Sequence, residues 1–441
     1  MKPTPLSGFP EFLPAQRIVE LYVIDTVRET FELHGFASVE TRAVEPLEQL
    51  LRKGEIDKEV YVLRRLHADP DEGDSGLGLH YDLTVPFARY VLENAGKLEF
   101  PLRRYQIQKA WRGERPQEGR FREFTQADID VVGRDELPFH HDVEIARVMA
   151  EALSGLPVPR LRLQVNNRKL IEGFYRGIGV PDPFAVMRVI DKLDKVPGDV
   201  VAKMLADEAG LSDTQVAQCL ALAEIRTPDA SFADRVRALG VRHELLDIGL
   251  AELESVIAGC QDAASERLTV EADLRIARGL DYYTGTVFET RMSGFEGVGS
   301  ICSGGRYDSL ASDGRVTYPG VGISLGISRM LVPLLARGRL SASRAVPSAV
   351  LVALPSEADR ERCGEIAQAL RMRGIPTEVA PSAAKYGRQI RYAERRGIPF
   401  VWFPEAGEVR DIRSGDQVAA DPAIWTPPAA DLRPQIIEEN V

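Results

Sequence analysis

With 441 residues, 44% of them hydrophobic and 27% charged, the chain is long enough for roughly two or three globular domains. Its net charge of −11 argues against non-specific nucleic-acid binding, although local basic patches would still permit specific binding. No apolar run approaches ~20 residues and the first residues lack a signal-peptide pattern, so we expect no membrane span and a cytoplasmic location.

Hydrophobic periodicity predicts the elements that precede residue 90. They are one helix and three strands, over residues 16–34, 36–44, 61–66 and 79–87. Gly35 is placed to end the helix. In the last strand, alternation would put His80, Asp82 and Thr84 on one face. Asp82 and Thr84 would then be able to accept hydrogen bonds from one ammonium group.

Residues 105–132 predict a β-hairpin with a long basic loop, because two alternating stretches flank a Gly- and Pro-rich turn region. In the second strand Gln126, Asp128 and Asp130 share one face, and the opposite face is apolar. Residues 103–122 hold seven basic side chains, namely Arg103, Arg104, Lys109, Arg112, Arg115, Arg120 and Arg122. Arginine suits phosphate, and carboxylates suit an ammonium or imidazole group. The hairpin indicates a ligand with anionic and cationic parts, and a solvated surface hairpin is the alternative.

Metal ligation by the protein alone is not expected. The four cysteines form no CxxC pair and no zinc-ligand set with the six histidines, so we expect reduced thiols. The doublet His140-His141 begins a helix predicted over residues 137–153. Without a third ligand nearby in sequence, we interpret the doublet as capping or surface residues.

The rest of the chain divides into regions of different predicted secondary structure. A strand over residues 161–166 precedes a mainly helical stretch, residues 168–265, and another strand follows over 268–276. From about residue 346 strands alternate with helices, which predicts an α/β layer domain. Its elements are expected over residues 349–355, 358–374, 376–381, 383–397 and 399–403. The helix around 385–396 is locally basic, and the tail beyond Gln417 is expected to be irregular.

Five segments together resemble one family. RGERPQEGRFREFTQADIDVVG resembles motif 2 of class II aminoacyl-tRNA synthetases in the form seen in histidyl-tRNA synthetases. HGFASVETRAVEP resembles motif 1 and PGVGISLGISRML resembles motif 3. ARGLDYYTGTVFET and CSGGRYDSL resemble segments typical of histidyl-tRNA synthetases. The resemblance extends over nearly the whole chain, in the expected order.

The resemblance implies an α+β catalytic domain, in which helices flank an antiparallel sheet, with a helical insertion and a C-terminal α/β anticodon-binding domain. The catalytic domain would occupy residues 1–167 and 266–335, the insertion 168–265 and the anticodon-binding domain 346–441. The implied reaction joins L-histidine and ATP, with Mg²⁺, into histidyl-adenylate and pyrophosphate. The histidyl group then moves to the 3′-terminal ribose of tRNA(His). The resemblance also implies a homodimer.

Roles for single residues follow from the same resemblance. Arg112 would grip the α-phosphate and the attacking carboxylate, and Arg278 would stabilise charge on the α-phosphate in the transition state. The implied ATP-binding set is Arg112, Glu114, Arg120 and Arg329. The implied histidine-binding set is Asp82, Thr84, Gln126, Asp130, Tyr282, Tyr283, Tyr307, Gly304 and Gly305. Asp130 and Tyr283 would contact the imidazole nitrogens, and Asp82, Thr84 and Gln126 the α-amino group.

Two positions depart from common family patterns. Asp82 stands where many bacterial members have Glu, and Ser328 replaces the acid that often precedes the motif 3 arginine. At Ser328 we expect lost support, not lost function. Two non-enzymes are the alternatives: a histidine-binding paralogue that regulates a biosynthetic partner, and a tRNA-sensing module beside a kinase. No kinase motif is found, and both the C-terminal domain and ARGLDYYT are present, which favours the enzyme.

Overall fold

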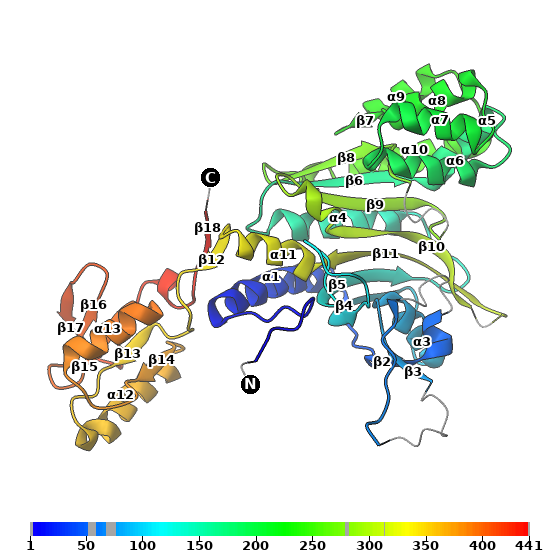
Figure 1. Cartoon of the computed structure of the whole chain (residues 1–441). Helices are drawn as coiled ribbons and strands as arrows, with labels where there is room; N and C mark the ends of the chain where they lie inside the picture. The colour runs from blue at the N-terminus through cyan, green and yellow to red at the C-terminus, as the bar shows by residue number, and fades with distance from the viewer. Residues whose placement is uncertain (1–2, 52–58, 68–75, 278–281, 313, 440–441) are drawn as a thin grey trace. The chain divides into compact units, whose positions relative to one another are not determined.

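The computed structural model describes residues 3–51, 59–67, 76–277, 282–312 and 314–439 (Figure 1). The chain forms two compact units. The first contains Met1–Pro10 and Val23–Pro333, and the second contains Glu11–Tyr22 and Leu334–Val441. Within the described residues, no helix combines the length and apolar character that a membrane span requires.

The first unit is built on a mixed sheet that has nine strands in the described part of the chain. In spatial order they are β1 (Ala37–Ser38), β4 (Leu102–Trp111), β5 (Glu123–Val132), β11 (Thr317–Gly326), β10 (Cys302–Ser312), β9 (Thr286–Met292), β6 (Leu161–Asn167), β8 (Leu268–Asp273) and β7 (Arg226–Thr227). The central run from β4 to β6 is antiparallel, and the pairs β1–β4 and β6–β8 are parallel. The antiparallel sheet expected from the sequence is therefore the centre of a mixed one.

Cross-strand register gives this sheet one polar face. Asp130 of β5 lies opposite Arg104 of β4 and Gly322 of β11, and Gly322 lies opposite Gly305 of β10. Directly opposed residues point to the same side of a sheet. The alternate residues, such as Ile129 and Val131, are fully buried on the other side. Helix α4 (His140–Ser154) packs against β5, β8 and β11 (Figure 1).

The segment before the hairpin differs most from its prediction. The helix over 16–34 is confirmed as α1 (Pro14–Leu33), and Gly35 follows it with φ of 76°. The strand over 36–44 is reduced to β1 and β2 (Val44–Pro46), the latter pairing with β3 (Leu77–Leu79) and preceding the short α2 (Leu47–Leu50). The strand over 61–66 is wrong, since only an isolated bridge from Val62 to Gly78 forms.

The strand predicted over 79–87 is also wrong, because helix α3 (Thr84–Asn94) begins inside it. Asp82 Oδ1 accepts a hydrogen bond from the backbone N–H of Val85 at 3.0 Å, in the first turn of the helix. The backbone N–H groups of the first turn have no acceptor within the helix, so a carboxylate that accepts from one of them stabilises the helix. Pro86, which has no backbone N–H, is tolerated in this turn for the same reason. His80, Asp82 and Thr84 consequently do not share a strand face.

The helical content expected between residues 168 and 265 is found. The helices are α5 (Arg168–Gly177), α6 (Pro183–Ile190), α7 (Gly198–Asp207), α8 (Asp213–Ala223), α9 (Ser231–Ala238) and α10 (Glu244–Gly259). Figure 1 shows α5 to α9 gathered at the β7–β8 end of the sheet. The description of these residues as a separate insertion stays a prediction.

The His140-His141 doublet and the cysteines differ in their burial. His140 is exposed at the start of α4, as expected, but His141 is 6% exposed and its Nδ1 lies 3.0 Å from Glu144 Oε2. Burial lowers the pKa of His141. The four cysteines are buried free thiols, and burial raises the pKa of each.

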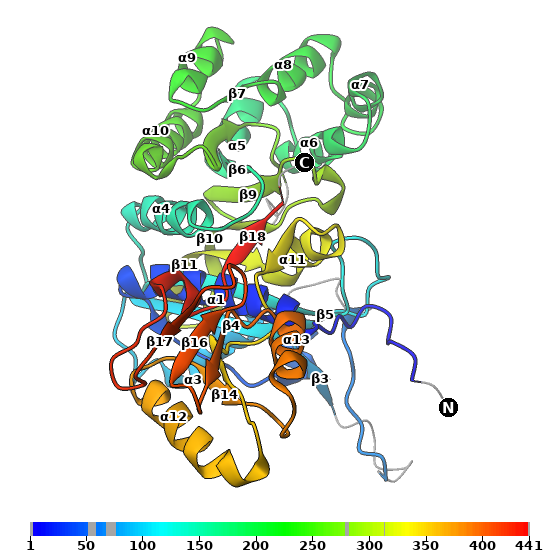
Figure 2. The ribbon, with the colours of Figure 1, turned by 90° about the vertical axis from the view of Figure 1, so that its left-hand side faces the viewer.

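The second unit has the expected alternating order, with β13 (Val350–Val352), α12 (Arg360–Met372), β14 (Thr377–Val379), α13 (Tyr386–Arg396) and β15 (Phe400–Phe403). These three strands are parallel, with β13 in the middle. The connection through α12 runs from β13 to β14, and the one through α13 runs back from β14 past β13 to β15. Connections that cross a sheet in opposite directions with the usual right-handed sense place their helices on opposite faces, and Figure 2 shows α12 and α13 on different sides of the strands.

Several short elements complete the second unit. The antiparallel strands β16 (Glu408–Asp411) and β17 (Gln417–Ala419) extend its sheet. Their mixed or exposed composition gave no periodic signal. Helix α11 (Ile327–Ala336) leads to β12 (Leu340–Ala342), which pairs with β18 (Ile436–Glu438). The prediction of an irregular tail is therefore wrong at β17 and β18.

Candidate active site

A cavity of about 180 Å³ opens on the polar face of the sheet, where the hairpin meets α3 and the start of α11. All the residues predicted to bind ATP or the amino group lie on its wall: Asp82, Thr84, Arg112, Glu114, Arg120, Gln126 and Arg329. Tyr283, predicted to contact the imidazole, lines it as well. These residues come from four separate stretches of sequence. The fold thus brings together the side chains that the resemblance assigned to one site.

A smaller cavity of about 40 Å³ adjoins the first, because Thr84, Tyr283, Ser303 and Ser324 line both. Its predicted members are Asp130, Tyr282, Tyr283, Tyr307 and Gly304, and it also includes Asp128. Gly305 lines neither cavity. Arg278 lies outside the described residues, so its assigned role stays a prediction.

Glycine at two positions makes room for the inner cavity's walls. A Cβ atom at Gly305 would lie 2.8 Å from the Tyr283 ring, and one at Gly322 would lie 2.0 Å from Asp130 Oδ1. Real Cβ atoms do not approach other atoms so closely, so larger residues would displace the ring or the carboxylate. Gly305 therefore acts through Tyr283, and the sequence could not show this because the contact joins β10 to the segment before β9.

Three arginines line the larger cavity, each held by other groups. Arg112 donates from Nε to the Tyr81 carbonyl at 3.0 Å, and its guanidinium lies 5.1 Å from the Phe124 ring centre. Arg329 donates to the carbonyls of Gly119 and Ser300 at 2.7 and 2.9 Å. Arg120 forms an ion pair with Glu114 at 2.9 Å. Guanidinium groups fixed in this way need little reorganisation when they meet phosphate oxygens.

The other hairpin cations have different positions. Arg103 pairs with Glu144, Lys109 pairs with Glu123, and Arg122 donates to the Glu114 carbonyl at 3.3 Å. Arg115 is exposed. Of the seven cations that sequence analysis grouped together, only Arg112 and Arg120 line the cavity, because strand alternation and turns point the rest elsewhere.

Arg104 is the least expected of these cations. It is fully buried, its Nη2 lies 2.7 Å from Asp130 Oδ2, and its guanidinium carbon lies 4.0 Å from the Phe87 ring centre. The Tyr307 hydroxyl donates to Asp130 Oδ1 at 2.8 Å. Sequence analysis missed this role, although pairing the two hairpin strands outward from the loop would have placed Arg104 opposite Asp130.

The comparisons with known proteins agree with this geometry. The family model described as histidyl-tRNA synthetase matches residues 8–330, and the model described as anticodon binding domain matches residues 349–413. The chain belongs to the histidyl-tRNA synthetase family. The resemblance found in the sequence, and with it the fold class, is confirmed.

Individual relatives cover almost the whole chain. Proteins named histidine–tRNA ligase from Cutibacterium acnes and Micrococcus luteus are 61% and 60% identical to it, over 98% of this chain and 98% of each relative. The crystal structure of histidyl-tRNA synthetase from Nostoc sp. PCC 7120 matches with a TM-score of 0.84 at 32% identity, covering 95% of this chain and 96% of that one.

A more distant structure shares the fold alone. An ATP phosphoribosyltransferase regulatory subunit/histidyl-tRNA synthetase from Bacillus halodurans matches with a TM-score of 0.72 at 20% identity. The fold by itself therefore does not separate a synthetase from a regulatory relative, and the distinction depends on the site.

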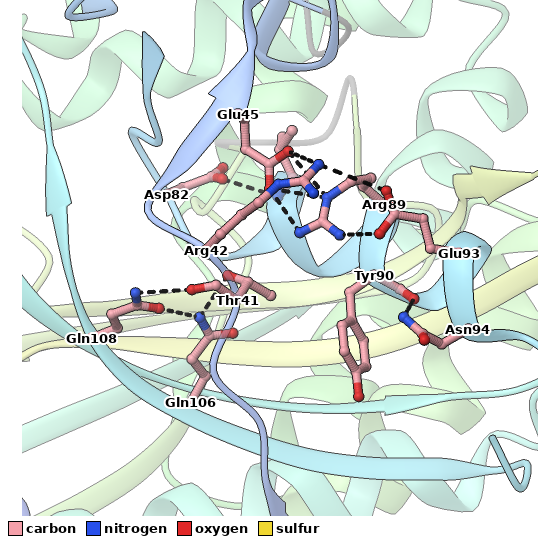
Figure 3. A network of polar contacts seen from close by, with 11 residues as sticks. Thr41, Arg42, Glu45, Asp82, Arg89, Tyr90, Glu93, Asn94, Gln106 and Gln108 are labelled. Carbon is pink, nitrogen blue, oxygen red and sulfur yellow. Dashed lines mark hydrogen bonds and ion pairs between the residues drawn. The ribbon is translucent and has the colours of Figure 1, made fainter. Parts of the chain in front are cut away.

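A polar network holds α3, which begins at Thr84 on the wall of the larger cavity (Figure 3). Glu45, fully buried, accepts hydrogen bonds from Arg89 of α3 at 2.7 to 3.1 Å and from Arg42 at 3.1 Å. Gln106 and Gln108 donate to the Thr41 hydroxyl and carbonyl, each at 3.0 Å. The motif 1 segment thereby ties α3 to the first strand of the motif 2 hairpin.

Motif 3 and motif 2 are joined through Ser328, the residue that departs from the family pattern. Its hydroxyl accepts a hydrogen bond from the backbone N–H of Thr125 at 2.8 Å, and the side chain is 3% exposed. Serine thus links the start of α11 to β5, and the expectation that Arg329 has lost the support of an acid stays a prediction.

We expect Ser328→Ala to lower the free energy of unfolding by about 1–3 kcal/mol, because it leaves the buried Thr125 amide without an acceptor. Chemical denaturation measures this, and Ser255→Ala on the exposed side of α10 serves as a control expected within about 0.5 kcal/mol of the parent. Equal stabilities for the two variants would contradict the assigned link.

Proposed function

We propose that this chain ligates L-histidine to tRNA(His) in two steps, through histidyl-adenylate. One observation carries the proposal: in a member of this family, an arginine-walled cavity adjoins a buried pocket of carboxylates and tyrosines on one sheet face. A phosphate-bearing nucleotide suits the first cavity, and an amino acid with a basic ring suits the second.

The α-amino group of histidine is assigned to the boundary between the two cavities. Gln126 Nε2 donates to Ser324 Oγ at 2.6 Å, while its Oε1, which is buried, has no hydrogen-bond partner among the described residues. An ammonium group supplies the donor that this oxygen needs. Asp82 and Thr84 line the same cavity and complete the set.

The nucleotide's phosphates are assigned to the arginine wall. The histidine carboxylate oxygen attacks the α-phosphorus, a new O–P bond forms, and the bond to the leaving pyrophosphate breaks. Arg112 supports the α-phosphate and the carboxylate, while Arg120 and Arg329 hold the outer phosphates and Glu114 lies near the adenine. Negative charge grows on pyrophosphate during this step, so fixed cations lower the barrier. Resemblance alone gives Arg278 its place at the α-phosphate.

Mg²⁺ would enter on the phosphate oxygens of ATP and neutralise part of their charge. Among the described residues, no three His, Cys, Asp or Glu side chains are grouped so as to hold a metal by themselves. Glu114 is a carboxylate on the cavity wall, and such oxygens are the ligands that Mg²⁺ takes when substrate phosphates supply the others.

The second step needs the tRNA. We assign its anticodon to the unit around residues 349–413, where α13 carries Arg388, Arg391, Arg395 and Arg396. Residues 168–265 are assigned to the acceptor arm. A homodimer and a cytoplasmic location belong to the proposal on the strength of the family. A histidine-binding regulator is the competing function, and the match to an anticodon-binding domain favours the ligase.

Histidine-dependent exchange of pyrophosphate into ATP tests the proposal directly. We expect the purified chain to exchange with histidine and not with phenylalanine or glutamine, because buried polar groups in the inner cavity would be left unpaired by either competitor. Comparable exchange with a competitor would contradict histidine as the substrate. Exchange with histidine but no charging of tRNA(His) would contradict the second step alone.

A further inference from the structure

Asp128 is a buried carboxylate with spare hydrogen-bonding capacity beside the proposed imidazole site. It is 3% exposed and lines the inner cavity, and its buried Oδ1 has no hydrogen-bond partner among the described residues. A hydrogen bond with the Ser324 side chain uses part of the accepting capacity of the Asp128 carboxylate. Buried carboxylate oxygens are rarely left without a donor, so the empty position indicates a ligand donor.

Asp130, two residues further along β5, differs in this respect. Its Oδ1 accepts the Tyr307 hydroxyl at 2.8 Å and its Oδ2 pairs with Arg104 at 2.7 Å. Protein groups therefore already meet both of its oxygens. Of the two carboxylates in the inner cavity, Asp128 is the one with an oxygen that no described protein group occupies, and this oxygen can accept from a new N–H group.

Among the described residues, the charges around the inner cavity do not balance when both Asp128 and Asp130 are ionised. Arg104 compensates only one of them, and Asp82 adds a further negative charge nearby. Burial raises the pKa of Asp128 to about 7, with Asp130 and Asp82 acting in the same direction and Arg104 and Ser324 opposing it. The remaining titratable neighbours stay neutral near pH 7, since the pKa values of Tyr282, Tyr283, Cys302 and Tyr307 are all raised.

We propose that Asp128 receives one imidazole nitrogen of histidine and that ring and carboxylate together hold a single shared proton. The inference rests on the proposed function and adds a specificity-determining residue to it. A neutral ring beside an ionised Asp128 would leave one uncompensated buried negative charge, which is unfavourable. One proton makes the pair neutral overall, whether it resides on the ring or on the carboxylate.

The proton count fixes the pH dependence of histidine binding. Free imidazole has a pKa of ~6.5, and that of Asp128 is raised to about 7. Well above both values neither group carries the proton, so binding must take one from water. Well below both, each carries one, and binding must release one. Histidine affinity should therefore peak near pH 6.5–7 and weaken toward about tenfold per pH unit on either side.

Isothermal titration of histidine into the parent protein, in buffers of different ionisation enthalpy, measures this proton. We expect close to one proton taken up per histidine at about pH 8, and net release at about pH 5.5. Asp128→Asn keeps an acceptor oxygen but does not titrate. It should bind histidine about tenfold more weakly and take up almost no proton at about pH 8, because a neutral acceptor replaces a charged one.

Asp142→Asn is the matched control. Asp142 is fully buried on α4, pairs with Arg306 at 2.6 Å, and lines neither cavity. This variant should retain the parent's proton uptake. The inference is overturned if the parent binds histidine without uptake at about pH 8, or if Asp128→Asn takes up as much as the parent. The parent measurement decides even if a variant fails to fold. A parent that binds no histidine would instead contradict the proposed function.

Discussion

Replacing Arg112 by alanine is expected to slow adenylate formation by about 10²–10³-fold, with a much smaller change in the Michaelis constant for histidine. The Tyr81 carbonyl and the Phe124 ring hold the Arg112 guanidinium at the cavity wall before any ligand arrives. A cation fixed there contributes most when charge moves through the α-phosphate, so its loss raises the barrier more than it weakens ground-state binding. Single-turnover adenylate formation at saturating ATP and histidine measures the effect.

Arg115→Ala separates this role from the general basicity of the loop. Arg115 belongs to the same loop but is exposed and does not line the cavity. Its removal should change the rate by only a few-fold, and the Arg112→Lys variant should remain far below the parent because an ammonium lacks the planar fork. Equal losses for Arg112→Ala and Arg115→Ala would show that the loop acts through its total charge.

The parts of the fold that could be predicted from sequence are those whose own periodicity agrees with their surroundings. The hairpin from residue 105 to 132 alternates cleanly and becomes β4 and β5, and the α/β order of the second unit follows from buried strand runs such as that at Val350–Val352. The alternating pattern around Asp82 predicted a strand that does not form, because a hydrogen bond from the Val85 amide to the Asp82 carboxylate starts α3 there. Such a local contact outweighs a weak pattern over nine residues.

The site divides in a similar way. Residues that the resemblance assigns to ligands could be named from the motifs, and the described ones line the two cavities except for Gly305. Contacts between segments that lie far apart in the chain could not be named. Gly305 of β10 beneath the Tyr283 ring, and Ser328 of α11 on the Thr125 amide, join segments that only the tertiary fold brings together. Arg104 on Asp130 differs, because the register of a single hairpin sets that pair and pairing the two strands outward from the loop would have found it.

Removing the Arg104 side chain is expected to destabilise the fold, because its buried partners cannot replace its contacts by small shifts. Its side chain is fully buried, with Nη2 at 2.7 Å from Asp130 and Nη1 donating to Gln106 Oε1 at 3.2 Å. Breaking a buried ion pair by removing one partner leaves the other charged and desolvated, which costs more than the intact pair contributes.

Arg104→Met should therefore lower the free energy of unfolding by about 3–5 kcal/mol at neutral pH. Without its cation, the Asp130 carboxyl should acquire a raised pKa, and its protonated form would then be favoured in the folded state. The deficit should accordingly shrink as the pH falls toward 5 and grow as the pH rises. Denaturant unfolding of parent and variant across this range is the measurement, and a deficit independent of pH would show that lost packing on Phe87 is the cause.

The double variant Arg104→Met/Asp130→Asn completes the test. Asparagine can still accept the Tyr307 hydroxyl but carries no charge, so the uncompensated group is gone and most of the lost stability should return. Histidine binding should not return with it, because the inner cavity would have lost one of the carboxylates that attract a basic ring.

Recovery of stability without recovery of affinity would separate the two functions of the pair: Arg104 makes it possible to bury Asp130, and Asp130 in turn shapes the pocket around Tyr307. Recovery of neither would show that Arg104 acts through its packing on Phe87, and that its charge is secondary.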